Sequence, residues 1–378
     1  MNGKKEGLGL YIHIPFCRSR CHYCSFYSII ANSHRVSLYL KALFRELEMS
    51  ADVIRSRGIR SIYIGGGTPS ILSSEQLISI LDKLASIIAI PDDIEVTLEA
   101  NPNDWRFEQA SDLFQRGFNR LSFGVQTFDD DLLRQIGRRH NSADVYNSLE
   151  ASQNAGFRNI SIDLIYDLPR QTLRHWRDSL SRAVDLNIQH ISFYNLTVEP
   201  GSSFYKDKEK IYSLMPDEDL SYNMLSEGRS LLSEAGFEQY EISAFCRDSK
   251  YAEHNIGYWK GLDYLGFGPA AHGFYEGSRY ANIANLGRYM ELLKADQRPL
   301  DFTEQLSEER SIVERLIINL RILKGVDLAA YTGLSEVVWD QINVLIVQGL
   351  LVHNGDNLRL SATGLDFYDY IAQELVLL

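Results

Sequence analysis

The stretch Tyr11-Ile-His-Ile-Pro-Phe-Cys17-Arg-Ser-Arg-Cys21-His-Tyr-Cys24 holds three of the four cysteines in a chain of 378 residues. Three cysteines spaced C-x3-C-x2-C on one loop can bind a single soft metal centre, whereas disulfide pairing would leave one over. A tetrahedral zinc site needs a fourth ligand, for which His13 and His22 are candidates. An iron–sulfur cluster held by three thiolates instead keeps one iron open to a chelating ligand. The spacing alone leaves both kinds of site open.

Strand and helix patterns alternate outward from this stretch. Apolar runs predict strands at Gly9–Ile14, Ser61–Gly65, Ile94–Glu99, Asn119–Gln126, Asn159–Ile165 and His190–Asn195. Such alternation with helical segments predicts βαβ units and a parallel sheet. Polar or special residues lie at or near the C-terminal ends of successive strands, namely Cys17, Gly66, Glu99, Gln126 and Asp163. Functional residues on one rim are typical of a barrel, so we predict an α/β fold with a partial TIM-like (β/α)6 barrel rather than a doubly wound sheet.

The last part of the chain differs in composition. Helical spacing at Leu306–Ile322 and 326–347, a hairpin around Asn354-Gly355 and a closing helix at Thr363–Leu375 predict a small α+β domain. This domain resembles a winged helix, but the segment is not basic, so DNA binding is not favoured. We expect a barrel at 1–236, a connecting region at 237–298 and the C-terminal domain at 299–378.

Composition and charge argue against several classes of function. The net charge of −12 argues against a nucleic-acid partner bound through its phosphates. The sequence shows neither a signal peptide nor an apolar run of about 18 residues that would predict a membrane-spanning helix. Few and clustered cysteines predict a cytoplasmic protein with a metal site, with peripheral contact at the inner membrane face left open.

A glycine-rich turn, Gly65-Gly-Gly-Thr-Pro69, follows the second expected strand. Glycines there allow backbone groups to approach a ligand closely, and the lysine of a P-loop is absent from the motif. Together with the cysteines, this turn resembles the radical S-adenosylmethionine (SAM) proteins of the oxygen-independent coproporphyrinogen III oxidase family. The resemblance covers nearly the whole chain. It implies a 4Fe-4S cluster bound by Cys17, Cys21 and Cys24.

In that family SAM chelates the open iron, and one electron from the cluster cleaves it to methionine and a 5′-deoxyadenosyl radical. The residues that match the family's SAM site are Tyr11, Tyr23, Gly66, Gly67, Thr68, Glu99, Gln126, Arg138 and Asp163. The resemblance gives Arg138 to the SAM carboxylate and Tyr23 to the adenine. It gives Glu99 and Asp163 to the ribose hydroxyls or the amino group. Taken singly, the two carboxylates are equally explained as helix caps, and Arg138 as the partner of a surface carboxylate.

Two details distinguish the branches of this family. Its dehydrogenases typically carry a cysteine two positions beyond the third cluster ligand, where this chain has Phe26. The run His254-Asn255-Ile-Gly-Tyr258-Trp259 matches the haem-binding H-N-x-x-Y-W signature of the HemW-type haem chaperones. The resemblance implies haem binding by these four residues, with His254 or Tyr258 as the axial ligand. Without it, the aromatic patch predicts a core seam between the barrel and the C-terminal domain.

The resemblance therefore implies a haem chaperone that binds a 4Fe-4S cluster, SAM and haem. Its expected partners are apo-haemoproteins, including membrane-associated respiratory enzymes, and an electron donor for the cluster. No catalytic residue is assigned. The alternative is an oxygen-independent coproporphyrinogen III oxidase, and a third is radical chemistry on an unrelated small molecule. Two departures are Asp167, where the family has glycine, and Cys246, an isolated thiol that we expect to be buried or incidental.

Overall fold

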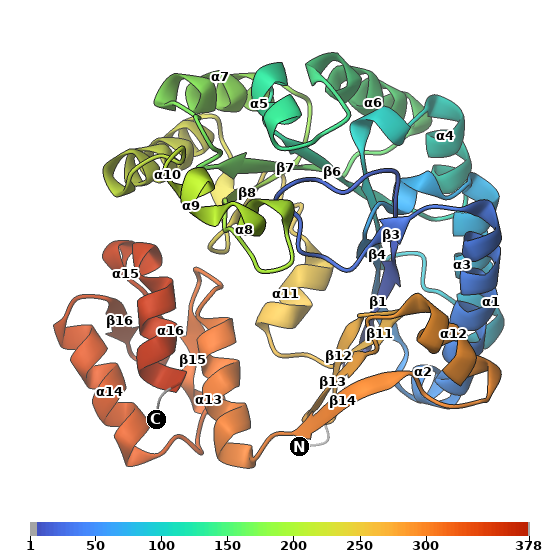
Figure 1. Ribbon diagram of the computed structural model, residues 1–378. Helices are drawn as coiled ribbons and strands as arrows, with labels where there is room; N and C mark the ends of the chain where they lie inside the picture. The colour runs from blue at the N-terminus through green and yellow to red at the C-terminus, as the bar shows by residue number, and fades with distance from the viewer. Residues whose placement is uncertain (1–5, 377–378) are drawn as a thin grey trace.

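The computed structural model describes residues 6–376 and has a curved sheet at its centre (Figure 1). The middle of the sheet consists, in chain order, of β1 (Leu8–Ile14), β4 (Ile59–Gly66), β5 (Glu95–Ala100), β6 (Arg120–Gln126), β7 (Ile160–Tyr166) and β8 (His190–Asn195). Each of these strands pairs in parallel with the next one. The expected α/β fold with a partial (β/α)6 barrel is confirmed.

Alternation along the strands separates an apolar layer from a polar one. In β6, Leu121, Phe123 and Val125 belong to the main hydrophobic core, whereas Arg120 and Ser122 belong to the wall of an interior cavity. Successive side chains of a strand point to opposite faces, so the apolar set packs under the outer helices. The barrel interior is therefore unusually polar.

Helices cover the outer face of the barrel (Figure 1). They are α1 (Ser33–Met49), α2 (Ala51–Arg57), α3 (Ser74–Ile87), α4 (Phe107–Gln115), α5 (Asp130–Gln135), α6 (Ser142–Ala155), α7 (Leu173–Val184) and α10 (Glu218–Glu234). Capping boxes begin α3, at Ser73 and Gln76, and α6, at Asn141 and Asp144. Among residues 6–376, no helix has both the length and the apolar character to span a bilayer.

The region 237–298, expected to connect the barrel to the C-terminal domain and to carry the haem-binding-like motif, also extends the same sheet at both edges. Strands β9 (Glu238–Gln239) and β10 (Ala244–Cys246) follow β8, and β11 (Tyr264–Phe267) pairs in parallel with β1. Beyond β11 come β12 (His272–Tyr275), β13 (Ser278–Asn282) and β14 (Leu300–Gln305), all antiparallel. The order is β14-β13-β12-β11-β1-β4-β5-β6-β7-β8-β10-β9. Between the two edge additions runs the helix α11 (Glu253–Trp259), and α12 (Leu286–Lys294) packs on α1.

The C-terminal part has a hydrophobic core of its own, as expected for a small α+β domain. It comprises α13 (Glu308–Asn319), β15 (Val326–Asp327), α14 (Glu336–Val347), β16 (Leu351–Asn354), β17 (Asn357–Leu360), α15 (Ala362–Asp366) and α16 (Tyr368–Val376). The three strands form a separate sheet in the order β15-β17-β16. Asn354 pairs with Asn357, so the hairpin turn is Gly355-Asp356, one residue later than the expected Asn-Gly turn.

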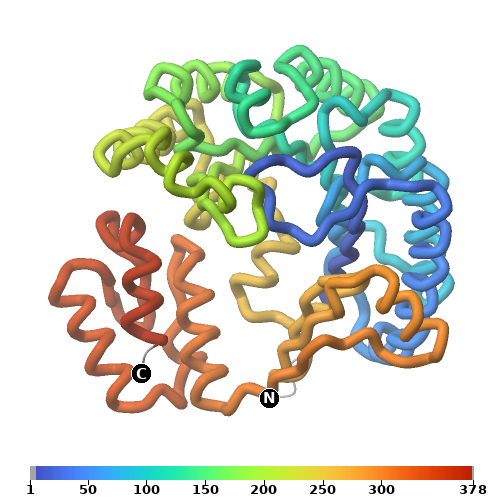
Figure 2. The backbone as a smooth tube through the Cα atoms, in the orientation of Figure 1, coloured from blue at the N-terminus to red at the C-terminus, as the bar shows by residue number. Residues whose placement is uncertain are grey.

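The cysteine stretch forms a loop beside two short helices, α8 (Ser203–Lys206) and α9 (Lys208–Tyr212). Figure 2 shows this loop in dark blue next to the yellow-green trace of α8 and α9. The backbone N–H of Phe204 donates to the carbonyl of His22 at 2.9 Å. At the base of the loop, β2 (Phe16–Cys17) pairs in parallel with β3 (Ile29–Ile30). The loop is therefore held at both its base and its side.

A buried carboxylate on α1 joins the barrel to the added strands. The Glu46 carboxylate accepts hydrogen bonds from Gly268 N at 2.8 Å, Tyr289 Oη at 2.6 Å and Asn282 Nδ2 at 2.6 Å. Burial raises the pKa of Glu46 to about 7, although these donors oppose the shift. The folded state therefore favours the protonated acid more than the unfolded chain does.

Glu46 should make the protein less stable as pH rises. Because its folded pKa exceeds its usual value, its contribution is complete below about pH 4.5 and is lost as pH rises through about 7. We expect this group to lower the free energy of unfolding by roughly 2–3 kcal/mol across that window. Urea unfolding of anaerobic protein at pH 5 and pH 8 should show a flatter pH dependence for Glu46→Gln. The exposed Glu48→Gln is the control, and a slope in Glu46→Gln equal to that of the wild type would contradict the prediction.

Candidate cofactor site

A cavity of about 420 Å³ lies inside the barrel toward the C-terminal ends of its parallel strands, within the size range of small-molecule sites. Twelve of the sequence-predicted site residues line it: Cys17, Cys21, Tyr23, Cys24, Gly66, Gly67, Thr68, Glu99, Gln126, Arg138, Asp163 and Asn255. The other four lie outside the wall that the described residues form: Tyr11, His254, Tyr258 and Trp259. Residues that are far apart in the sequence, from Cys17 to Asn255, thus lie around one cavity.

The cysteine loop receives hydrogen bonds at two of its sulfur atoms. Thr68 Oγ1 donates to Cys17 Sγ at 3.4 Å, and Arg138 Nη1 donates to Cys21 Sγ at 3.6 Å. Donors directed at sulfur stabilise the thiolate, which is the form that binds a metal. Burial raises the pKa of the Cys24 thiol, so a bound metal has to supply the charge that deprotonates it.

Both ring nitrogens of His13 and the Nδ1 of His22, the two histidines near the loop, have other partners. His13 Nδ1 faces Tyr11 Oη at 2.9 Å and its Nε2 faces the carbonyl of Tyr27 at 3.0 Å, while His22 Nδ1 faces the carbonyl of Gln135. Within residues 6–376, no three His, Cys, Asp or Glu side chains converge on a point where one metal ion could bind. A cubane cluster does not need that convergence, because each thiolate binds a different iron. Three soft thiolates beside a cavity fit an iron–sulfur cluster with one open iron.

The glycine turn is shaped by its contact with the cysteine loop. A Cβ atom on Gly67 would lie 2.7 Å from the carbonyl oxygen of Phe16 and 3.0 Å from Cys17 Sγ. Gly67 N also donates to the carbonyl of Ile14 at 2.8 Å. Only glycine fits between these atoms, so the motif brings the backbone against the cluster loop.

Two buried carboxylates face the cavity from neighbouring parts of the barrel. Glu99 accepts hydrogen bonds from Tyr63 Oη at 2.7 Å and from Gly66 N at 3.0 Å, and Ser122 Oγ lies 3.3 Å from Asp163 Oδ2. Burial raises the pKa of Glu99, and it raises the pKa of Asp163 to about 7 with a further contribution from the charge of Glu99. A ligand with a positive charge or hydroxyl donors would stabilise both ionised carboxylates.

Arg138 is already engaged by the protein. Its guanidinium donates to Asn101 Oδ1 at 2.7 Å, to the carbonyl of Gly124, to Cys21 Sγ and to His140 Nδ1. Burial, with the charge of Arg138, lowers the pKa of His140 to about 3, so this histidine is neutral. Arg138 therefore connects the cysteine loop to β6.

Gln126 ends β6 in a strained conformation. Its φ of 71° lies in the left-handed region that disfavours residues other than glycine, and the β6–β7 register shifts between Gly124 and Gln126. A Cβ atom on Gly124 would lie 2.8 Å from Gln126 Nε2. Backbone strain of this kind is concentrated at ligand sites, because the surrounding structure must hold it in place.

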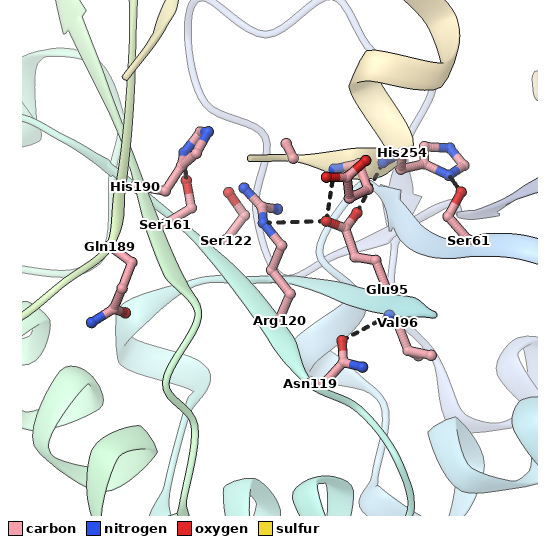
Figure 3. A network of polar contacts seen from close by, with 12 residues as sticks. Ser61, Glu95, Val96, Asn119, Arg120, Ser122, Ser161, Gln189, His190 and His254 are labelled. Carbon is pink, nitrogen blue, oxygen red and sulfur yellow. Dashed lines mark hydrogen bonds and ion pairs between the residues drawn. The ribbon is translucent and has the colours of Figure 1, made fainter. Parts of the chain in front are cut away.

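Two matched His–Ser pairs lie on either side of Arg120 (Figure 3), and a tyrosine completes each of them as a triad. His254 Nδ1 faces Ser61 Oγ at 2.8 Å and its Nε2 faces Tyr258 Oη at 2.7 Å. His190 Nδ1 faces Ser161 Oγ at 2.7 Å and its Nε2 faces Tyr240 Oη at 2.8 Å. Each histidine is only 1% exposed. Burial lowers the pKa of both, that of His254 to about 3, so both rings are neutral.

The H-N-x-x-Y-W motif forms α11 and reaches from the cavity to the C-terminal domain. Glu95 accepts hydrogen bonds from the N–H groups of Glu253 and His254 at 2.9 and 3.1 Å, which fixes the start of the helix (Figure 3). At the other end the guanidinium of Arg321 lies 4.3 Å from the Trp259 ring centroid. The aromatic residues of the motif thus form the contact between the barrel and the C-terminal domain that they predict on their own. Asn255 of the same helix faces the cavity.

Sequence reasoning missed several residues of the cavity wall. They are Tyr63, Asn101, Arg120, Ser122, Ser192 and Tyr194. Most of them are polar residues in strands whose alternate positions are apolar, and this pattern is the signal that could have identified them. Arg120 is the clearest case, because it is the only charged residue of β6.

The structure also places Phe26 and the two departures, Asp167 and Cys246. Phe26 is 66% exposed and lies in the cavity wall. Asp167 adopts a φ of 63° and accepts a hydrogen bond from Ser221 Oγ at 2.6 Å. That positive φ explains why glycine is usual there. Cys246 is buried in β10, as expected.

Family models and known proteins that are similar to this chain cover most of its length. The radical SAM superfamily model matches residues 11–183, and the HemN C-terminal domain model matches residues 306–367. Heme chaperone HemW of Bacillus subtilis is 39% identical, covering 92% of this chain and 93% of that protein. The HemW protein of Escherichia coli is 33% identical, covering 96% of both. The structure resembles E. coli coproporphyrinogen III oxidase (HemN), a radical SAM enzyme, with a TM-score of 0.86 at 24% identity, covering 99% of this chain and 91% of HemN.

Proposed function

This chain belongs to the HemW family within the radical SAM superfamily, and on that premise we propose that it is a haem chaperone. In this proposal it binds a 4Fe-4S cluster, SAM and haem, and it passes haem to apo-haemoproteins, among them membrane-associated respiratory enzymes. It works in the cytoplasm and receives electrons for the cluster from a separate donor. The proposal that it binds haem rests on the names of its relatives. The proposal that it binds a cluster is supported by the three thiolates beside the cavity.

One observation carries this proposal. Asn255 of the H-N-x-x-Y-W motif lines the same cavity as Cys17, Cys21 and Cys24. A cluster at the cysteines and a haem at the motif would therefore occupy adjoining space. Phe26, exposed in the same wall, provides apolar surface for a macrocycle where dehydrogenases of the family typically carry a fourth cysteine.

The residues divide among the cluster, SAM and haem as follows. The three cysteines hold the cluster, and the cluster supplies one-electron chemistry to SAM when it is bound. Glu99 and Asp163 accept hydrogen bonds from SAM, while Gly66, Gly67 and Thr68 shape the wall beside the cluster. Tyr11, which binds His13 behind that wall, supports the loop from outside the cavity. Tyr23, Gln126 and Arg138 complete the proposed SAM site.

The proposed haem residues are His254, Asn255, Tyr258 and Trp259. His254 can ligate iron only if Ser61 or Tyr258 leaves its ring, since both ring nitrogens have hydroxyl partners. Its lowered pKa favours this role, because the neutral imidazole is the form that binds a metal. Haem binding would thus require a local rearrangement of α11.

Two measurements on one anaerobic, cluster-reconstituted preparation test the proposal. We expect haem titration to reach one haem per chain, because one H-N-x-x-Y-W motif is present. We expect no conversion of coproporphyrinogen III to protoporphyrinogen, because Phe26 replaces the additional cysteine. The E. coli oxidase is the positive control for turnover. Robust turnover without haem uptake would establish the oxidase alternative instead.

A further inference from the structure

Arg120 is a buried cation at the floor of the cavity whose guanidinium is free to bind a ligand. The residue is 2% exposed, yet it belongs to the cavity wall. Its Nε lies 3.8 Å from Glu95 Oε2, which is an ion pair but too long for a hydrogen bond. Within residues 6–376, no acceptor forms a hydrogen bond with its Nε, which is fully buried. Buried guanidinium groups normally donate to acceptors, so the Arg120 Nε lacks a hydrogen-bond partner among these residues although Glu95 balances its charge.

Arg120 and Arg138 line the same cavity but differ in their partners. Four groups already accept from Arg138, among them Asn101 Oδ1 and Cys21 Sγ. Arg120 lies at the start of β6 and Gln126 at its end, so Arg120 is at the opposite end of the strand from the rim that holds Arg138. The hydroxyl groups of Ser122, Ser192 and Tyr194 line the same cavity.

Glu95 cannot fully satisfy Arg120, because it has another role. Its two carboxylate oxygens accept from the N–H groups of Glu253 and His254. Figure 3 shows the Arg120 guanidinium between Ser122 and Glu95, with α11 above. Glu95 thus balances the charge of Arg120 while its hydrogen bonds hold the helix.

We propose that Arg120 is a binding residue for a carboxylate of a ligand that reaches the floor of the barrel. The planar guanidinium suits two parallel hydrogen bonds to a carboxylate, and the surrounding hydroxyl groups can donate to the same anion. Two ligands carry this chemistry, namely the propionates of haem and the methionine carboxylate of a SAM molecule other than the one proposed at the open iron. The haem source rests on the proposed function, whereas the SAM source does not.

A ligand at Arg120 would also act on α11. A bound carboxylate competes with Glu95 for the guanidinium, and Glu95 holds the first turn of the helix that carries His254. Occupancy of the floor is thereby linked to the position of the haem motif. The coupling is reciprocal. A ligand that fixes α11 changes the affinity for the carboxylate by the same factor by which the carboxylate changes the affinity for that ligand.

Three variants test the proposal by equilibrium binding to anaerobic, cluster-reconstituted protein. The probes are SAM, haem and haem dimethyl ester, which lacks free carboxylates. We expect Arg120→Gln to weaken binding of SAM or of haem by roughly tenfold to a hundredfold, the range for a lost charge-assisted hydrogen bond. Glu95→Gln keeps one of the two acceptor oxygens for α11 and removes the competing negative charge, so its affinity for the ligand should equal or exceed that of the wild type. Arg120→Lys keeps the charge without the fork and should fall between them.

The outcomes separate binding from support of the fold. A loss confined to Arg120 variants supports the proposal, and in the haem arm the wild type should also discriminate against the dimethyl ester. Equal losses in Arg120→Gln and Glu95→Gln would show that the pair only positions α11, which overturns the proposal. Unchanged affinity for both ligands in Arg120→Gln overturns it too. If Arg120→Gln does not fold, Arg120→Lys gives the same comparison. Absent haem uptake by the wild type counts against the proposed function, and the SAM arm then judges Arg120 alone.

Discussion

Cys21→Ser is expected to reduce the iron and sulfide content of reconstituted protein to less than about a tenth of the wild-type value. Serine is similar in size but does not supply the soft thiolate that iron–sulfur clusters need. The loop should keep its path, because β2 and β3 close its base and Phe204 N binds the carbonyl of His22. Iron and sulfide analysis with the cluster's visible absorption measures the result. SAM affinity should fall at least about tenfold, because the open iron that chelates it is lost.

Cys246→Ser is the matched control for this experiment. Cys246 is also a free thiol, but it lies buried in β10 and outside the cavity wall that the described residues form. Its replacement should leave the iron and sulfide content unchanged. One zinc per chain without sulfide in the wild type, or a full cluster in Cys21→Ser, would falsify the assignment of the three cysteines.

The sequence predicted the central barrel well because its strands are long and their ends carry recognisable residues. The strands β4 to β8 each contain six to eight residues, long enough for alternation and for the flanking helices to be read. The added strands β9 and β10 have two and three residues, too few for any periodicity. The pairing of β10 with β8 and with β9 depends on tertiary contacts, so the sequence did not predict that the region 237–298 adds strands to the sheet.

For the site, twelve of the residues that the sequence predicted line the cavity, but the sequence did not show that four others lie outside its wall. Arg138 and Gln126 could be assigned by resemblance, yet the strained φ of Gln126 and the four partners of Arg138 are properties of the folded chain. Tyr11 shows the limit, because a position in β1 does not say whether the side chain faces a ligand or His13. The sequence shows Arg120 as the only charged residue of β6. That its Nε has no hydrogen-bond acceptor among the described residues is a property of the folded chain.

The H-N-x-x-Y-W motif poses the same problem more sharply. A histidine and a tyrosine four residues apart on a helix share one face, and this spacing serves equally a metal ligand and a buried hydrogen bond. The structure shows the hydrogen bond, between His254 Nε2 and Tyr258 Oη. A role for His254 at haem iron therefore has to be separated experimentally from its role in the fold.

His254→Ala is expected to lower both stability and haem affinity. Removing the ring leaves a cavity and two buried hydroxyl groups without their partner, at a cost of about 2–4 kcal/mol in the free energy of unfolding. If His254 is the axial ligand, haem affinity should also fall by at least about tenfold, with a shift in the Soret band. Denaturant unfolding and haem titration measure the two effects separately. Tyr258→Phe, which keeps the ring and removes only the hydroxyl, should cost less stability.

The second triad of the barrel floor provides the control that makes this test decisive. His190 is as buried as His254 and binds a serine and a tyrosine at matching distances, but it lies outside the motif. His190→Ala should therefore lose a similar amount of stability and keep its haem affinity. Equal haem affinities in the two variants would mean that His254 serves only the fold. Haem uptake that survives the combined replacement of His254 and Tyr258 by alanine would remove α11 as the haem site, because no ligating side chain of the motif would remain.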